Sequence, residues 1–223
     1  LIDHNHAARH ADKYAGRLPA AARLLGGPRY ALLAPAYAQA PRHLPGPLVR
    51  SIGIFMGGVD APGLALQALA ACSDAGFHGE VEVASTSACP HLPALRAAVA
   101  ARPHTRLSLD QPDLARFFAA HDLHIGAGGG ATWERCCLGA PTIALVTADN
   151  QREVLQPLQG LGVLAVASLQ GDHGQPQALA DALRQLLADA ELRRSLADNA
   201  TRWVDGRGAQ RVAAALLDLP FPA

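Results

Sequence analysis

The sequence has few aromatic residues, no excess of either charge and no long apolar run, and each shortage excludes a class of protein. Aromatic residues make up 4% of the chain, whereas alanine and leucine are abundant, which favours helices packed on a buried sheet over an all-β sandwich. Basic and acidic residues number 19 each without a basic block, so we expect no nucleic-acid partner. Every apolar run is interrupted well before the roughly 20 residues of a membrane span. With no signal peptide at the start either, we expect a cytoplasmic protein.

Cysteine is also scarce, and its spacing indicates neither a zinc site nor a disulfide framework. No two cysteines show a C-x-x-C spacing, and an adjacent pair within a helix cannot bond easily. The cysteines, which we expect to be reduced and packed in the core, are Cys72, Cys89, Cys136 and Cys137. His6 and His10 have the spacing of a weak metal pair on one helical face, but an exposed charged segment explains them as well. We therefore expect no metal and no cofactor.

From Ser51 onward, short β-rich runs alternate with helical stretches. This alternation predicts parallel strands joined by right-handed crossovers, in an α/β, Rossmann-like doubly wound sheet. Such a sheet binds ligands at the carboxyl ends of its strands. The strands are predicted at residues 51–56, 80–84, 105–109, 123–125, 142–146 and 163–167.

One glycine-rich segment, residues 123 to 151, organises the rest of the chain: LHIGAGGGATWERCCLGAPTIALVTADNQ. It reads as a strand, a glycine turn at 126–130 and a helix at 131–138. Glycines let the backbone approach a ligand closely, and the first free N–H groups of a helix favour an anion, most often phosphate. The residues that we expect to bind it are Gly128, Gly129, Gly130, Ala131 and Thr132.

Glu134 lies one turn into this predicted helix. A carboxylate there can accept hydrogen bonds from two ribose hydroxyls while the loop holds a diphosphate. The alternative is that Glu134 only complements the helix dipole, which is worth about 0.3–1 kcal/mol. Trp133 is expected to pack in the core, because adjacent helical side chains point in different directions. Arg135 is interpreted as a solvated helix position, with a countercharge as the alternative.

The strings IGAGGGATWERCCLGAPTIAL and ADNQ in this segment resemble the nucleotide-binding signature of the UDP-sugar hydrolases of pseudaminic acid biosynthesis. Those enzymes release UDP from UDP-2,4-diacetamido-2,4,6-trideoxy-β-L-altropyranose. The segment is more distantly similar to the C-terminal domain of the peptidoglycan N-acetylglucosaminyl transferase. The hydrolase resemblance extends to GPRYALLAPAY (27–37), IFMGGVDAPG (54–63) and VDGRGAQRVAAAL (204–216), so it covers nearly the whole chain.

The resemblance implies the C-terminal half of a glycosyltransferase-B-type fold. Residues 1–50 are rich in proline and include one predicted helix at about 7–24 that is interrupted near residues 16–19. They are expected to be a linker and a remnant of an N-terminal domain. Residues 51–223 are expected to form the UDP-binding domain. In the family, water attacks the anomeric carbon with inversion and UDP leaves. The alternatives are a glycosyltransferase, in which a sugar hydroxyl replaces water, and a non-catalytic module that binds UDP or a UDP-sugar.

The family's general base is a histidine of its N-terminal domain, and no residue of this sequence matches it. General acid–base catalysis contributes about 10²–10⁴ in rate, so we expect this polypeptide alone to bind UDP weakly and to turn over little or nothing. The sequence also departs from the family's pattern at an arginine, which is Ala34 here, and at the following Glu-Phe, which is Ala36-Tyr37.

Gly57 and Gly58 form a second glycine turn between a predicted strand and a predicted helix. Their backbone can also contact a ligand, and the family's corresponding loop faces the cleft between its domains. An ordinary βα turn explains them as well. Asp60 is interpreted as the cap of the following helix rather than as a catalytic acid.

Asn150 and Gln151 follow the fifth strand of the predicted sheet at its carboxyl edge. Asn150 can hold a sugar amide or orient an attacking water, and Gln151 can serve a second group in the same way. The alternative for Asn150 is a helix cap, and both roles are compatible.

A dinucleotide site is the main rival. Gly126, Gly128 and Ala131 fit the fingerprint G-x-G-x-x-A, and Asp149 stands near the place of a ribose-binding acid. Against a nicotinamide cofactor, the motif belongs to the fourth βα unit instead of the first, and Glu134 is ionic where that fingerprint's helix presents small or apolar residues.

Overall fold

Six parallel strands form one sheet in this computed structural model, which describes residues 1–5, 10–19, 21–146, 149–168 and 176–217. The spatial order is β5-β4-β3-β6-β7-β8, and every neighbouring pair is parallel. The strands are β3 (Ser51–Phe55), β4 (Glu80–Ser85), β5 (Thr105–Leu109), β6 (Leu123–Ala127), β7 (Thr142–Val146) and β8 (Ala165–Ser168). Each coincides with a predicted strand to within two residues, and the order is that of a doubly wound sheet.

Helices cover both faces of this sheet, as an all-parallel sheet requires. α3, α4 and α8 pack on one face, and α5, α6 and α7 pack on the other. Their bounds are α3 (Leu64–Asp74), α4 (Leu92–Ala101), α5 (Ala115–Ala120), α6 (Ala131–Leu138), α7 (Asp149–Gly160) and α8 (Pro176–Ala188). Along β7 the pleat sends Ile143 and Leu145 into one core cluster and Ala144 and Val146 into the other, so this strand is buried throughout.

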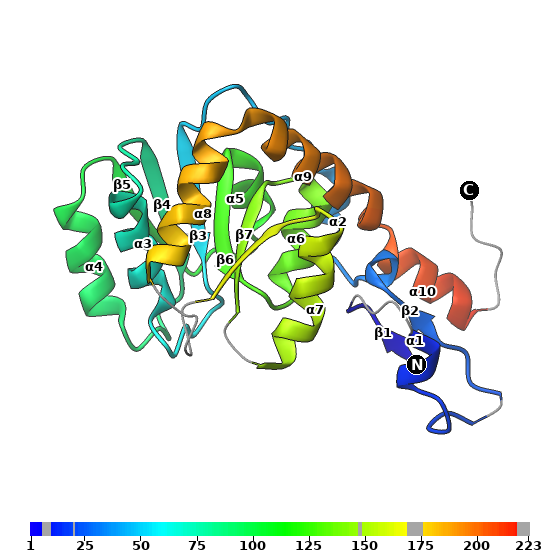
Figure 1. Cartoon of the computed structure of the whole chain (residues 1–223). Coiled ribbons are helices and arrows are strands. Elements are labelled where there is room, and N and C mark those ends of the chain that lie inside the picture. The colour runs from blue at the N-terminus through cyan, green and yellow to red at the C-terminus, as the bar shows by residue number, and fades with distance from the viewer. Residues whose placement is uncertain (6–9, 20, 147–148, 169–175, 218–223) are drawn as a thin grey trace.

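The first and last described segments lie together beside the sheet. β1 (Ile2–Asp3) pairs in parallel with β2 (Leu25–Gly26), and η1 (Pro28–Tyr30) and α2 (Pro35–Gln39) follow. At the other end, α9 (Ala190–Trp203) packs on α6, and α10 (Gly208–Leu216) packs on η1 (Figure 1). The last described helix is thus packed against the segment that follows β2.

The helix predicted at about 7–24 is found only before its predicted interruption near residues 16–19, within the described residues. In the described part of that segment, α1 (His10–Lys13) has four residues, and the chain then turns at Gly16 with φ 68°. Asp3 explains the early end, because its Oδ2 accepts hydrogen bonds from Lys13 Nζ (2.6 Å) and from the Tyr14 hydroxyl (2.7 Å). These contacts draw both side chains toward β1 instead of along a helix.

All four cysteines are free and buried, which confirms their predicted packing role. Over the part of the chain that the structure describes, no helix has the length and apolarity to cross a membrane.

Candidate functional site

The two glycine turns lie side by side at the carboxyl edge of the sheet. β3 and β6 are paired in parallel with Phe55 opposite Gly126, so the turn after β3 and the loop after β6 leave the sheet next to each other. The strand order reverses here, because β4 lies beyond β3 on one side and β7 lies beyond β6 on the other. Open α/β sheets bind their ligands in the crevice at such a point.

The turn after β3 is closed by one of its own side chains. Asp60 is buried, and its Oδ1 and Oδ2 accept hydrogen bonds from the backbone N–H groups of Leu64 and Ala65, both at 2.9 Å. Asp60 thus satisfies the first helix amides as predicted, although the N-cap residue of α3 is Gly63, three positions later. Because the first two amides of α3 are already bonded, the turn after β3 is poorly suited to a pyrophosphate. Gly57 and Gly58 as ligand contacts stay predictions.

The loop before α6 is arranged differently, because no side chain among the described residues caps this helix. The amides of Thr132 and Trp133 donate to the carbonyls of Gly129 and Gly130, each at 3.0 Å. The amides of Gly129, Gly130 and Ala131 have no hydrogen-bond partner within the described ranges. Unsatisfied amides at a helix N-terminus carry partial positive charge and suit an anion.

Packing accounts for two of the glycines in this loop and leaves two unexplained. A Cβ on Gly126 would lie 2.4 Å from Nη1 of Arg135, and one on Gly128 would lie 2.4 Å from Cδ1 of Leu155, so neither position has room for a side chain. At Gly129 and Gly130 a Cβ would meet no atom of another described segment within 4 Å, and neither glycine has a positive φ. Packing among the described residues does not require glycine there, and ligand contact at Gly129 and Gly130 stays a prediction.

Glu134 is half-buried on α6, next to Tyr37 of α2. Burial raises the pKa of Glu134, while a hydrogen bond from the Tyr37 hydroxyl and the charge of Arg135 act to lower it. Burial and the Glu134 carboxylate together raise the pKa of Tyr37. Its hydroxyl therefore stays protonated and donates a hydrogen bond to Glu134. The sequence analysis missed this contact, although the departure from the family's phenylalanine at Tyr37 was its signal.

Arg135 contradicts the prediction of a solvated side chain. It is 1% exposed, and its Nη2 donates to the carbonyl of Ala127 at 2.9 Å. Helical side chains point back toward the preceding turn, which carries the guanidinium beneath the glycine loop. Trp133 is 2% exposed, so its predicted place in the core is confirmed.

The remaining predicted contacts divide between the loop and the start of α7. The Thr132 side chain is buried, with Oγ1 3.5 Å from the carbonyl oxygen of Ala127, so only its backbone faces the loop. Gln151 reaches the loop, because its Oε1 lies 3.1 Å from where a Cβ on Gly128 would be. The side chains of Asp149 and Asn150 lie outside the described part, and the role of Asn150 stays a prediction.

No metal site is present where the structure describes the chain, since no group of three or more histidine, cysteine, aspartate or glutamate residues is placed to hold an ion. The pair His6 and His10 lies outside the side chains that are described.

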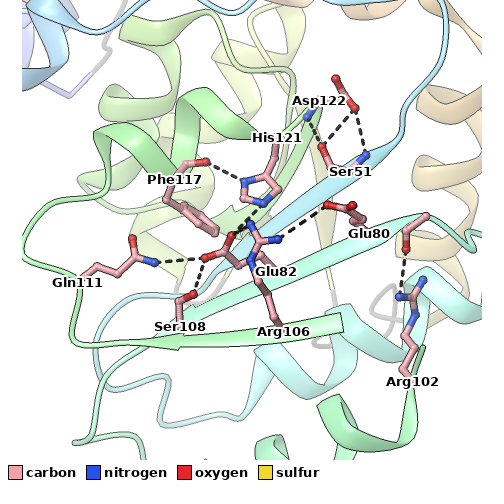
Figure 2. Close-up of polar contacts among 11 residues, drawn as sticks. Ser51, Glu80, Glu82, Arg102, Arg106, Ser108, Gln111, Phe117, His121 and Asp122 are labelled. Carbon is pink, nitrogen blue, oxygen red and sulfur yellow. Dashed lines mark hydrogen bonds and ion pairs between the residues drawn. The ribbon is translucent and has the colours of Figure 1, made fainter. Parts of the chain in front are cut away.

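A second polar cluster lies on the sheet face that carries α5, and Figure 2 shows its side chains converging on Glu82 of β4. Glu82 is 6% exposed and accepts hydrogen bonds from Ser108 Oγ at 2.5 Å and from Gln111 Nε2 at 3.3 Å. Arg106 forms an ion pair with it, and His121 Nε2 lies 3.2 Å from its Oε2. Because protein groups already surround this carboxylate, the cluster is structural. Sequence analysis missed it, although polar residues alternate along β4 and β5.

Because of this cluster, the free energy of unfolding falls as the pH becomes acidic. Burial disfavours the Glu82 carboxylate, but its contacts with His121, Ser108 and Arg106 outweigh burial and lower its pKa from 4.5 to about 2. The resulting stability is present above pH 4.5 and is lost as pH falls toward 2, by about 2–3 kcal/mol.

We expect Glu82→Gln to remove most of this loss when urea unfolding is measured from pH 6 to pH 2.5. Glu80→Gln, at an exposed neighbour on β4, is the control and should retain it. If Glu82→Gln lost as much stability as the wild type between pH 6 and pH 2.5, Glu82 would not be the group responsible.

Comparison with known proteins gives relatives in sugar transfer and polysaccharide synthesis, while no protein-family model matches the sequence. The chain is 28% identical over 201 residues to the spore coat polysaccharide biosynthesis protein SpsG of Bacillus subtilis (strain 168), a match that covers 88% of this chain and 59% of that protein. It is 38% identical over 113 residues to the UDP-N-acetylglucosamine–N-acetylmuramyl-(pentapeptide) pyrophosphoryl-undecaprenol N-acetylglucosamine transferase of Sorangium cellulosum (strain So ce56), covering 48% of this chain and 27% of that protein.

Among solved structures, MurG of Acinetobacter baumannii matches with a TM-score of 0.66 at 16% identity, over 98% of this chain and 66% of that chain. This likeness confirms the predicted fold class, a Rossmann-like half of a glycosyltransferase-B-type fold. The chain spans less than two-thirds of the length of each of these three proteins.

Proposed function

We propose that this chain binds the nucleoside diphosphate of a nucleotide sugar, with the diphosphate at residues 128–131 and the ribose at Glu134. The observation that carries the proposal is the uncapped start of α6, where the amides of Gly129, Gly130 and Ala131 have no partner among the described residues. A diphosphate suits those amides, and a carboxylate one turn deeper suits a pair of hydroxyls. The relative that is named for UDP-N-acetylglucosamine supports uridine as the nucleoside.

The reaction that we infer is glycosyl transfer. In it, a hydroxyl of an acceptor attacks the anomeric carbon of the sugar, and the nucleoside diphosphate leaves. The free amides at the start of α6 would stabilise the negative charge that develops on the departing diphosphate. The similarity to an N-acetylglucosamine transferase supports transfer over hydrolysis.

Hydrolysis of UDP-2,4-diacetamido-2,4,6-trideoxy-β-L-altropyranose is the second candidate, and the motif GAGGGATWERC at residues 126–136 favours it. Asn150 would then orient the attacking water. Product analysis of the full-length protein separates the two reactions. UDP release that requires an acceptor supports transfer, whereas UDP and free sugar formed without an acceptor support hydrolysis. Binding of UDP without any turnover would instead leave a nucleotide-sugar binding module.

Binding tests the site directly. We expect Glu134→Ala to weaken UDP binding roughly 10-fold in titration calorimetry, because hydrogen bonds to a charged group contribute about 1.5–3 kcal/mol. The loss should be much smaller for 2′,3′-dideoxy-UDP, which lacks the hydroxyls that the carboxylate would accept from. Glu191→Ala removes an exposed carboxylate of α9 and serves as the control with unchanged affinity. Equal losses for both nucleotides would remove the ribose assignment.

A further inference from the structure

The two fully buried arginines of this chain differ in what their guanidinium groups contact. Arg193 and Arg135 are each 1% exposed. Arg193 donates four hydrogen bonds to backbone carbonyls. Arg135 donates from Nη2 to the carbonyl of Ala127, with Thr132 Oγ1 at 3.4 Å, while its Nε and Nη1 have no partner within the described part of the chain. Arg193 is thus a satisfied structural arginine, and Arg135 is not.

An unsatisfied buried cation is costly. Removing a charged group from water costs several kcal/mol unless an opposite charge or a full set of hydrogen bonds replaces the water. Within the described ranges, no acidic side chain forms an ion pair with Arg135, although the Glu134 carboxylate lies near enough to favour its charge. Burial lowers the pKa of Arg135 to about 10, so the group is still charged at neutral pH.

The position of this charge coincides with the proposed diphosphate site. Nη1 lies 2.4 Å from where a Cβ on Gly126 would be, and that same point lies 2.9 Å from the carbonyl oxygen of Phe55. The guanidinium therefore lies where β3 and β6 end. On another side it faces the ring of Phe118, with Cζ 5.7 Å from the ring centroid. Little water surrounds the charge to screen it.

We propose that Arg135 is a fixed positive charge beneath the glycine loop, which favours the anionic diphosphate of a bound nucleotide without touching it. This inference rests on the proposed function. The hydrogen bond from Arg135 to the Ala127 carbonyl also fixes the first peptide of the loop, so that the following amides stay directed at the ligand. Arg135 is accordingly a positioning residue, and its effect on affinity follows the charge of the ligand.

A series of ligands that differ in charge tests this role. Titration calorimetry at pH 7.5 and low salt compares uridine, UMP and UDP on the wild type and on Arg135→Met. We expect the substitution to weaken UDP binding roughly 10-fold or more, since opposite charges in a poorly hydrated site attract each other even without contact. The loss should be smaller for UMP and less than about 2-fold for uridine. Arg135→Lys keeps the charge and should restore most of the preference for UDP over uridine.

The controls separate this role from a purely structural one. Equal weakening of all three ligands by Arg135→Met, or no weakening at all, overturns the inference while the proposed function stands. A wild type that binds neither UDP nor uridine overturns the proposed function itself. Should Arg135→Met fail to fold, Arg135→Gln, which is neutral but can still donate to Ala127, takes its place with the same expectation. Arg193→Lys should lower stability without changing the ratio of UDP to uridine affinity.

Discussion

Gly130→Val is expected to reduce UDP affinity roughly 100-fold or more, because each hydrogen bond to a charged group contributes about 1.5–3 kcal/mol and an isopropyl group would cover several free amides at once. Gly130 has φ −54° and ψ −36°, which valine adopts without strain, and a Cβ there would meet no atom of another described segment within 4 Å. The protein should therefore fold, and the added side chain should occupy the place of the phosphate. Titration calorimetry with UDP measures the loss.

Gly160→Val is the matched control for this experiment. Gly160 is the last residue of α7, and a Cβ there likewise meets nothing within 4 Å. We expect UDP affinity close to that of the wild type. If Gly130→Val bound UDP as well as this control does, the diphosphate would lie elsewhere and the proposed function would lose its main support.

Arg193→Met is expected to lower the free energy of unfolding by about 1–3 kcal/mol, because carbonyl groups would be left without a hydrogen-bond donor. Nη1 of Arg193 donates to the carbonyls of Leu186 (2.5 Å) and Leu187 (3.2 Å), and Nη2 donates to those of Gly46 and Pro47, both at 2.9 Å. Leu186 and Leu187 lie in the last turn of α8, where carbonyls have no partner within the helix. Methionine would fill the space but leave four carbonyl acceptors, one buried and three part-buried, without this donor. Urea unfolding measures the difference.

The neighbouring Arg194 provides the control. Its side chain is half-exposed and forms an ion pair with Glu191 three residues earlier in α9. Such surface pairs contribute about 0.3–0.5 kcal/mol, so Arg194→Met should change stability by no more than that. Equal effects at both positions would contradict the role of Arg193 in holding residues 46–47 against the end of α8.

The strands of the sheet could be predicted because their chemistry is local. β-branched runs and the turns between them identify six strands, and each is found. The ends are less certain in such a prediction: β6 continues to Ala127, two residues past its predicted end, although glycine and alanine favour strands little. The continuation comes from pairing, since β6 has a hydrogen-bonded neighbour on each side, with Gly126 opposite Phe55 and Ala127 opposite Leu145.

Arg135 could not be placed from the sequence, because charge on a short helix normally indicates the solvent-exposed face. α6 is instead enclosed by neighbouring elements, and all but two of its eight residues are buried. Tyr37 and Glu134 are 97 positions apart in the sequence, so no local pattern links them.

By itself, the sequence determined the order of strands and helices, the glycine turns at two strand ends and the interpretation of Asp60 as a cap, since each depends on residues close together in the chain. Tertiary structure alone decided which glycine turn has amides without a partner among the described residues, and that the Arg135 guanidinium lies beneath that turn. It also decided that Glu82 is surrounded by partners from β5 and the loop before β6. The physical reason is that burial, and with it the cost of an unpaired charge or an unsatisfied amide, depends on neighbours that only folding brings together.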